Sequence, residues 1–278
     1  MIVRRLLFFL SLTLAFFILG EVLLERVYSR VPFAVWPPHY SVIFEPTPNI
    51  TPGISGRTRF FINSKGIRGD EFSSEPQSHI LAVGGSTTEC FFLDQSEAWP
   101  ALLQEKLKAH GYNVWVGNVG ASGIDTRHHL LQVKYLLPQY PFIDTLLLMT
   151  GVNDLLLRLW EDGSYRPTPY FETRLLREAF YIVPLTKKTT DPSFKRTGWW
   201  QALRSVKWLI LPRTMNVQKK AHEVLVDRRK KRESASGFRK ELPDMTLALQ
   251  EYRSNLNEIV DLAHQHSVRL ILITQSFT

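Results

Sequence analysis

The chain has 278 residues, of which 44% are hydrophobic and 22% are charged. These values exclude a disordered chain, a collagen and a membrane protein with many spans, and the length suits one or two domains. Cys90 is the single cysteine, which excludes an intramolecular disulfide and a metal site built from several cysteines. The net charge is +8, but residues 185–240 hold 16 lysines and arginines against only four acids, so the positive charge is concentrated there.

The N-terminus carries an apolar run that is long enough to cross a bilayer. Two arginines precede the run from Leu6 to Leu24, in which Glu21 is the only charged residue. No Ala-x-Ala cleavage pattern follows, so residues 1–25 are expected to be an uncleaved signal anchor and transmembrane helix rather than a cleaved signal peptide. A short basic flank before the run places the amino terminus in the cytoplasm and the bulk of the chain on the extracytoplasmic, periplasmic side.

Residues 26–78 are expected to form an extended linker and a lead-in to the main domain. Prolines are dense between residues 31 and 56, and proline cannot donate a main-chain hydrogen bond, so this part is expected to be irregular. A short strand is expected from Arg59 to Ile62, followed by a turn.

From residue 79 onward, short apolar runs alternate with helical patterns. Strands are expected at residues 80–83, 113–116, 145–149 and 268–274, and helices at 97–109, 125–137 and 244–264. This alternation predicts an α/β domain over residues 79–278, with three layers in which helices cover both faces of a parallel sheet. Residues 157–243 interrupt the alternation, and we interpret them as a basic, aromatic-rich insertion that is partly helical.

Three of the expected strands end in residues that suggest chemistry. Ser86 follows two glycines after the first strand, Gly123 lies in a glycine-rich segment after the second, and Asn153 follows the third. Because the carboxyl ends of parallel strands form one crevice, these residues are expected to lie together. The N–H groups of Ser86 and Gly123 and the amide of Asn153 would then form an oxyanion hole beside the Ser86 hydroxyl.

In order and in spacing, these segments resemble the SGNH/GDSL hydrolase family. The resemblance covers residues 59–156 and 243–275, and it implies a flavodoxin-like hydrolase domain. Ser86 matches the nucleophilic serine of the family, and Gly123 and Asn153 match the oxyanion-hole residues. The resemblance further implies a serine esterase without a metal or an organic cofactor, acting on an ester such as an O-acyl group of a glycan or a lipid.

The chain departs from the family in two places. Gly85 replaces the aspartate that often precedes the serine, and the Asp-x-x-His block that supplies the general base after the last strand is not present. We therefore expect a C-terminally incomplete domain, a fragment or a truncated form with impaired activity. Asp261 and His264 fit the spacing but precede the last strand, at the wrong end of the sheet. His128 and His129 lie on the correct side but are expected to be surface residues of a helix.

A non-catalytic protein tethered to the membrane is the alternative. It would hold an anionic glycan or lipid surface in the ester pocket or on the basic insertion, although the run from Arg228 to Arg232 is also typical of a solvated helix face. Nucleic acid is not expected as a partner of a chain whose bulk lies outside the cytoplasm.

Smaller expectations concern the lead-in and the last strand. The segment from Phe61 to Phe72 resembles the lead-in of membrane-anchored bacterial members of the family, and Arg68 is expected to support it structurally. Cys90 is expected to be a small buried apolar residue. The strand at residues 268–274 would be an exposed sheet edge, so the isolated chain is expected to fold poorly or to associate.

Overall fold

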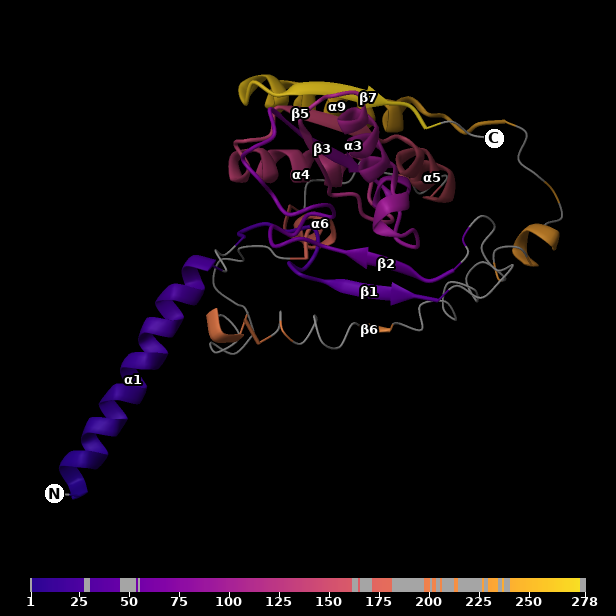
Figure 1. The fold of residues 1–278 in the computed structure, drawn as a ribbon. Helices are drawn as coiled ribbons and strands as arrows, with labels where there is room; N and C mark the ends of the chain where they lie inside the picture. The colour runs from indigo at the N-terminus through magenta and orange to yellow at the C-terminus, as the bar shows by residue number, and fades with distance from the viewer. Residues whose placement is uncertain are drawn as a thin grey trace.

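The structure is a computed structural model, drawn as a ribbon in Figure 1. It describes residues 2–27, 31–45, 54, 56–161, 165, 172–181, 198–200, 202, 203, 206, 213, 214, 227, 230–234, 237 and 241–275. Most of the insertion expected at residues 157–243, with Arg228 and Arg229 of its basic run, lies outside these residues.

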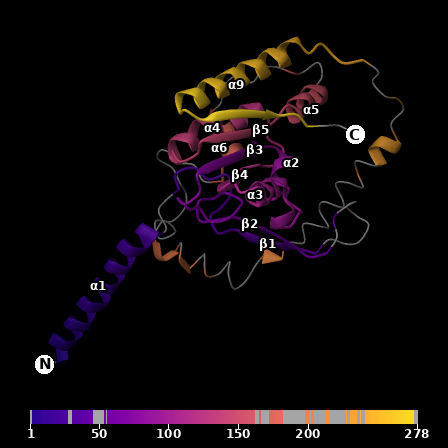
Figure 2. The same ribbon diagram turned by 45° about the horizontal axis from the view of Figure 1, so that its top comes forward.

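A four-stranded parallel sheet forms the centre of the main domain. Its strands are joined in the order β4-β3-β5-β7, and every neighbouring pair is parallel. In Figure 2 the four strands follow one another across the domain from β7 to β4. Their bounds are Ser78–Gly84 for β3, Val114–Asn118 for β4, Thr145–Met149 for β5 and Arg269–Ile273 for β7. The parallel α/β sheet expected from the sequence is therefore confirmed.

Helices connect the strands of this sheet. The helix α3 follows β3 and packs against β4, while α4 follows β4 and packs against α9, which leads into β7. Pro100 lies in the first turn of α3, where a missing N–H leaves no hydrogen bond unmade. The bounds are Ser86–Glu89 for α2, Gln95–Glu97 for the 3-10 helix η1, Trp99–Ala109 for α3, Thr126–Gln139 for α4, Val152–Glu161 for α5, Glu172–Ala179 for α6 and Thr246–Gln265 for α9.

The strand order determines where a site can form. Because β3 lies between β4 and β5, the chain crosses from β3 to one side of the sheet and then returns past β3 to the other side. In an open α/β sheet the loops separate at such a switch point and leave a crevice at the carboxyl ends of the strands. The segments that follow β3, β4 and β5 begin at this crevice, and they are the three segments that carry the expected site residues.

The core lies between the sheet and its helices. All five residues of β4 and four of the five in β5 are buried, as is typical of parallel strands covered on both faces. Leu81 and Leu146 of the sheet pack with Leu130 of α4 in this core, and burying a leucine stabilises the fold by about 1.5–3 kcal/mol. The edge strand β7 differs, because Ile271 and Leu272 remain 43% and 54% exposed.

A second sheet forms before the main domain, where the sequence predicts an irregular linker. The strand β1, Ser41–Phe44, pairs antiparallel with β2, Thr58–Phe61, and parallel with the two-residue strand β6, Arg213–Thr214 (Figure 1). Its apolar side chains pack against Phe91 and Phe92, which lie just after α2. The prediction of an irregular segment is therefore wrong at β1, because its four residues contain no proline and can all form main-chain hydrogen bonds.

The N-terminal helix α1, Ile2–Val27, extends away from the rest of the chain in Figure 1. Its large apolar side chains between Phe8 and Leu23 are 49% to 64% exposed. Near its end, the Glu21 carboxylate accepts hydrogen bonds from the N–H groups of Gly198 and Trp199, at 2.6 and 3.2 Å. In the part of the chain that the structure describes, no helix combines the length and the apolarity needed to cross a membrane.

Candidate active site

Ser86 lies on a tight turn at the carboxyl end of β3. Its side chain is exposed, and its hydroxyl makes no hydrogen bond to any other described residue. The turn requires a glycine at position 84, because a methyl group there would lie 2.7 Å from the main-chain oxygen of Met149 and 2.2 Å from Thr88 Oγ1. The two glycines before Ser86 thus let β3, β5 and α2 approach closely while the serine hydroxyl points to solvent.

The loop after β4 brings Gly123 to the same edge of the sheet. The backbone of Gly123 has φ +79°, which favours glycine, and no atom lies within 4 Å of the place where a side chain would begin. Asn118 holds the start of the loop: its Oδ1 accepts from Gly120 N at 2.8 Å, and its Nδ2 donates to the oxygen of Thr88 at 2.6 Å. The loop is therefore fixed to α2, and the open side of Gly123 faces solvent.

Asn153 completes the group from the start of α5. Its Nδ2 donates to the oxygen of Ile124 at 2.6 Å and lies 2.9 Å from the position that a methyl group on Gly85 would occupy. The next residue, Asp154, accepts hydrogen bonds from the N–H and the hydroxyl of Thr126, so α5 holds the loop after β4 at two points. The structure thus brings together the surroundings of Ser86, Gly123 and Asn153.

His128 and His129 are buried at 5% and 1% exposure, so the prediction that they are surface residues is wrong. His128 Nδ1 lies 2.8 Å from Asp125 Oδ1, and its Nε2 lies 3.0 Å from Glu178 Oε2 of α6. Burial on its own lowers the pKa of His128, but the hydrogen bond with Asp125 and that carboxylate's charge outweigh it, so the pKa is raised. Both ring nitrogens are therefore engaged by carboxylates and not by Ser86.

Asp125 and His128 have the Asp-x-x-His spacing, and the sequence interpretation misses this pair. Burial raises the pKa of Asp125, but hydrogen bonds from His128 and Arg127 outweigh it and hold the pKa below its usual range. His129 contacts Thr150 through Nδ1 at 3.0 Å, and burial lowers its pKa to about 4. A histidine with so low a pKa is a weak proton acceptor, which argues against His129 as a base for Ser86. His128 is also unsuited to this role, because carboxylates engage both of its ring nitrogens.

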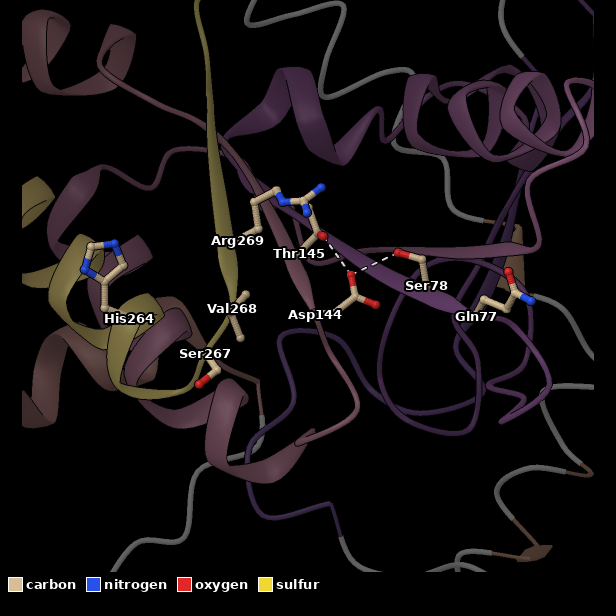
Figure 3. A pocket seen from close by; sticks show the side chains of 8 residues that line it. All are labelled: Gln77, Ser78, Asp144, Thr145, His264, Ser267, Val268 and Arg269. Carbon is tan, nitrogen blue, oxygen red and sulfur yellow. Dashed lines mark hydrogen bonds between the residues drawn. The ribbon is translucent and has the colours of Figure 1, made fainter.

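His264, in contrast, lies at the opposite end of the sheet, as the sequence predicts. It lines an open cavity of about 650 Å³ at the amino ends of β3, β5 and β7, which Figure 3 shows with its lining side chains. Asp144, between Ser78 and Thr145 in the figure, accepts hydrogen bonds from both hydroxyls, at 2.9 and 2.7 Å. Asp144 therefore joins β3 to β5, and the pair Asp261 and His264 takes no part in the site at the carboxyl ends.

Two further ionisable residues, Arg68 and Glu89, are buried at the end of α2, and the sequence analysis does not connect them with the site. The Arg68 guanidinium donates to the main-chain oxygens of Glu89 and Cys90, and to those of Leu93 and Asp94. Arg68 thus organises the segment after α2 rather than only the lead-in. Burial lowers the pKa of Arg68 to about 10 and raises that of Glu89 to about 7. Cys90 is half-buried rather than buried as predicted, and its backbone has φ 50°.

The part of the chain that the structure describes contains no group of three or more His, Cys, Asp or Glu that could hold a metal ion. The surroundings of Ser86 offer instead main-chain N–H groups and one carboxamide, which are donors suited to an oxyanion. The arrangement can therefore stabilise negative charge on an oxygen atom next to a serine hydroxyl.

Comparison with known proteins gives partial matches. No protein-family model matches the chain. An arylesterase of Vibrio mimicus is 32% identical over 82 residues, which make up 30% of this chain and 40% of that relative, so the matched part spans well under half of it.

Solved structures of several esterases are also similar to the chain. AlinE4, an SGNH-hydrolase family esterase, is 20% identical, with 72% of this chain and 77% of that chain covered and a TM-score of 0.31. The esterase EstA from Pseudoalteromonas sp. is 16% identical, with 71% and 78% covered and a TM-score of 0.30. A variant of Axe2, an acetyl xylan esterase from Geobacillus stearothermophilus, is 17% identical, with 66% and 95% covered and a TM-score of 0.28. The parallel sheet, with the segments of Ser86, Gly123 and Asn153 at the carboxyl ends of β3, β4 and β5, has the arrangement that the sequence predicts, and the arylesterase match covers only part of that relative.

Proposed function

We propose that the chain is a serine esterase in which Ser86 is the nucleophile and Gly123 and Asn153 bind the oxyanion. One observation carries the proposal. Asn153 Nδ2 lies beside Gly85, which precedes Ser86, and donates to the oxygen of Ile124, which follows Gly123, so this amide joins the two segments. The arylesterase match is consistent with this chemistry.

The reaction follows from these positions. Ser86 Oγ attacks the carbonyl carbon of the ester, and the carbonyl oxygen becomes an oxyanion that accepts hydrogen bonds from Ser86 N, Gly123 N and Asn153 Nδ2. The bond to the alcohol oxygen then breaks, and the alcohol leaves with the proton that Ser86 has lost, carried to it by water. A water molecule then attacks the acyl-enzyme, releases the acid and returns a proton to Ser86 Oγ. Among the described residues no base contacts the Ser86 hydroxyl, and a serine without a base is a weak nucleophile, so slow turnover is part of the proposal.

An ester with a small acyl group on a glycan or a lipid is the proposed substrate class. Ser86 and Gly123 are both exposed, which suits an ester carried on a large molecule. Ester hydrolysis by a serine nucleophile uses no metal ion and no organic cofactor, so we propose none.

The test is reaction of the full chain with a fluorophosphonate probe, which phosphonylates an activated serine, alongside hydrolysis of p-nitrophenyl acetate. We expect wild type to be labelled slowly, because no described base contacts Ser86, Ser86→Ala to lose both signals, and Ser254→Ala, an exposed serine of α9, to keep both. Equal labelling of wild type and Ser86→Ala would refute the role of Ser86. Absence of labelling in wild type would favour the alternative, a tethered protein that binds an anionic glycan or lipid surface without hydrolysing it.

We further propose that residues 1–25 anchor the chain to a membrane, with the bulk of the chain on the extracytoplasmic side. The support is the row of apolar side chains from Phe8 to Leu23, which stay 49% to 64% exposed even where Trp199 packs against Phe16 and Phe17. After expression in bacteria, the full chain should sediment with membranes through an alkaline carbonate wash, and a chain that starts at residue 31 should not. Release of the full chain by carbonate would contradict the anchor.

A further inference from the structure

Glu89 is a buried carboxylic acid at the junction of the nucleophile turn and the oxyanion loop. It is the last residue of α2, which begins at Ser86, and it is only 3% exposed. The Ser122 hydroxyl, one residue before Gly123, donates a short hydrogen bond to Glu89 Oε2. A side chain on the nucleophile helix is thus bonded to the neighbour of the expected oxyanion donor.

The shape of the loop makes this contact specific. A methyl group on Gly120 would lie 2.3 Å from the main-chain nitrogen of Glu89, so the two backbones touch there. The Asn118 side chain bonds to the oxygen of Thr88 at 2.6 Å on the same side. Those contacts fix the start of the loop, whereas the bond from Ser122 to Glu89 fixes its far half, where Gly123 lies.

The charges around Glu89 make the bond sensitive to protonation. Burial raises the pKa of Glu89 to about 7, and the hydrogen bond from Ser122 and the charge of Arg68 act in the opposite direction. Cys90 and Asp94 are the other titratable groups that face the same buried guanidinium. The acid therefore changes charge near neutral pH, and its ionised form is the stronger acceptor for the Ser122 hydroxyl.

We propose that Glu89 is a positioning residue of the site, which through Ser122 holds the loop of residues 119–124 so that the Gly123 N–H faces the oxyanion formed at Ser86. This inference rests on the proposed esterase function and adds a means by which pH regulates it. Glu89 does not touch the substrate, because its carboxyl group lies beneath the loop.

Amide hydrogen exchange of the loop tests the proposal without reference to activity. In the full chain, peptides covering residues 119–124 should exchange about tenfold more slowly at pH 8 than at pH 6, after correction for the intrinsic rate. Glu89→Gln removes the titrating acceptor and Ser122→Ala removes the donor, so each should remove this difference and the double variant should add nothing further. Glu105→Gln, which changes an exposed acid of α3, is the matched control and should behave as wild type.

The rate of fluorophosphonate labelling at Ser86 is the second readout. Wild type should show a step in this rate near pH 7 that Glu89→Gln lacks, a change that a purely structural role of Glu89 would not produce. If Glu89→Gln does not fold, Ser122→Ala removes the bond from its other end. Exchange in both variants equal to that of wild type would overturn the proposal. Wild type that shows the exchange difference but is never labelled would refute the esterase function and leave the loop contact established.

Discussion

Asn153 Nδ2 donates to the main-chain oxygen of Ile124 at 2.6 Å, so the amide expected to bind an oxyanion already holds the loop that carries Gly123. An amide nitrogen has two N–H groups, and only one of them is used by this bond. The other remains for an oxyanion beside Gly85, which lies against the same nitrogen. One side chain therefore holds the loop and, in the proposed function, also contributes a donor to the oxyanion hole.

Replacement of Asn153 by alanine should therefore damage catalysis more than substrate binding. Removing one oxyanion donor lowers kcat by about 10²–10³, and we expect Asn153→Ala to do so with little change in KM for p-nitrophenyl acetate. Asn153→Asp should be at least as impaired, because a carboxylate cannot donate to an anion. The control is Asn257→Ala on the exposed surface of α9, which should leave kcat unchanged. A kcat within twofold of wild type in Asn153→Ala would contradict this role.

Arg68 should be essential for stability, because its guanidinium is bound to four main-chain oxygens and is 1% exposed. Arg68→Ala removes a charged donor from all four oxygens, of which those of Cys90 and Asp94 keep a main-chain bond from Leu93 and Glu97. We expect it to lower the free energy of unfolding by about 3–5 kcal/mol. Arg68→Lys should remain strongly destabilised, since an ammonium group lacks the planar fork of donors. Urea titration followed by tryptophan fluorescence measures the loss, and Arg253→Ala on the surface of α9 is the control. A loss below about 1 kcal/mol in Arg68→Ala would show that water can replace the guanidinium.

The sequence predicts the central sheet and the three site segments because each depends on a local pattern. Apolar runs that end in small polar residues specify strands, and the parallel order then brings Ser86, Gly123 and Asn153 to one edge. The burial of His128 and the contact between Glu89 and Ser122 could not be predicted in this way. Both depend on contacts between residues far apart in the chain, or on neighbours in a packed loop, and a single sequence does not reveal these.

The contact between His128 and Asp125 predicts that the stability of the fold depends on pH. The pKa of His128 is raised in the folded protein, since the bond and charge of Asp125 outweigh burial. A group with a raised folded pKa stabilises the fold fully below its unfolded pKa, which is about 6.5, and this contribution is lost as pH rises through the folded pKa. His128→Gln should therefore lower the free energy of unfolding more at pH 5.5 than at pH 9. His266→Gln, at an exposed position after α9, should show no such difference. An equal loss at both pH values would mean that folding leaves the pKa of His128 unchanged.

The edge strand β7 predicts association of the chain. Among the described strands it pairs with β5 alone, and Ile271 and Leu272 remain 43% and 54% exposed on it. An exposed apolar edge offers unpaired N–H and C=O groups to another chain, and a lysine at such an edge suppresses this pairing. In detergent, which covers α1, wild type should elute as an oligomer in size-exclusion chromatography with light scattering, and Leu272→Lys should shift toward the monomer. Leu242→Lys, at an exposed leucine outside the sheet, should elute as wild type. A monomeric wild type with a cooperative melt would show that this edge does not pair in solution.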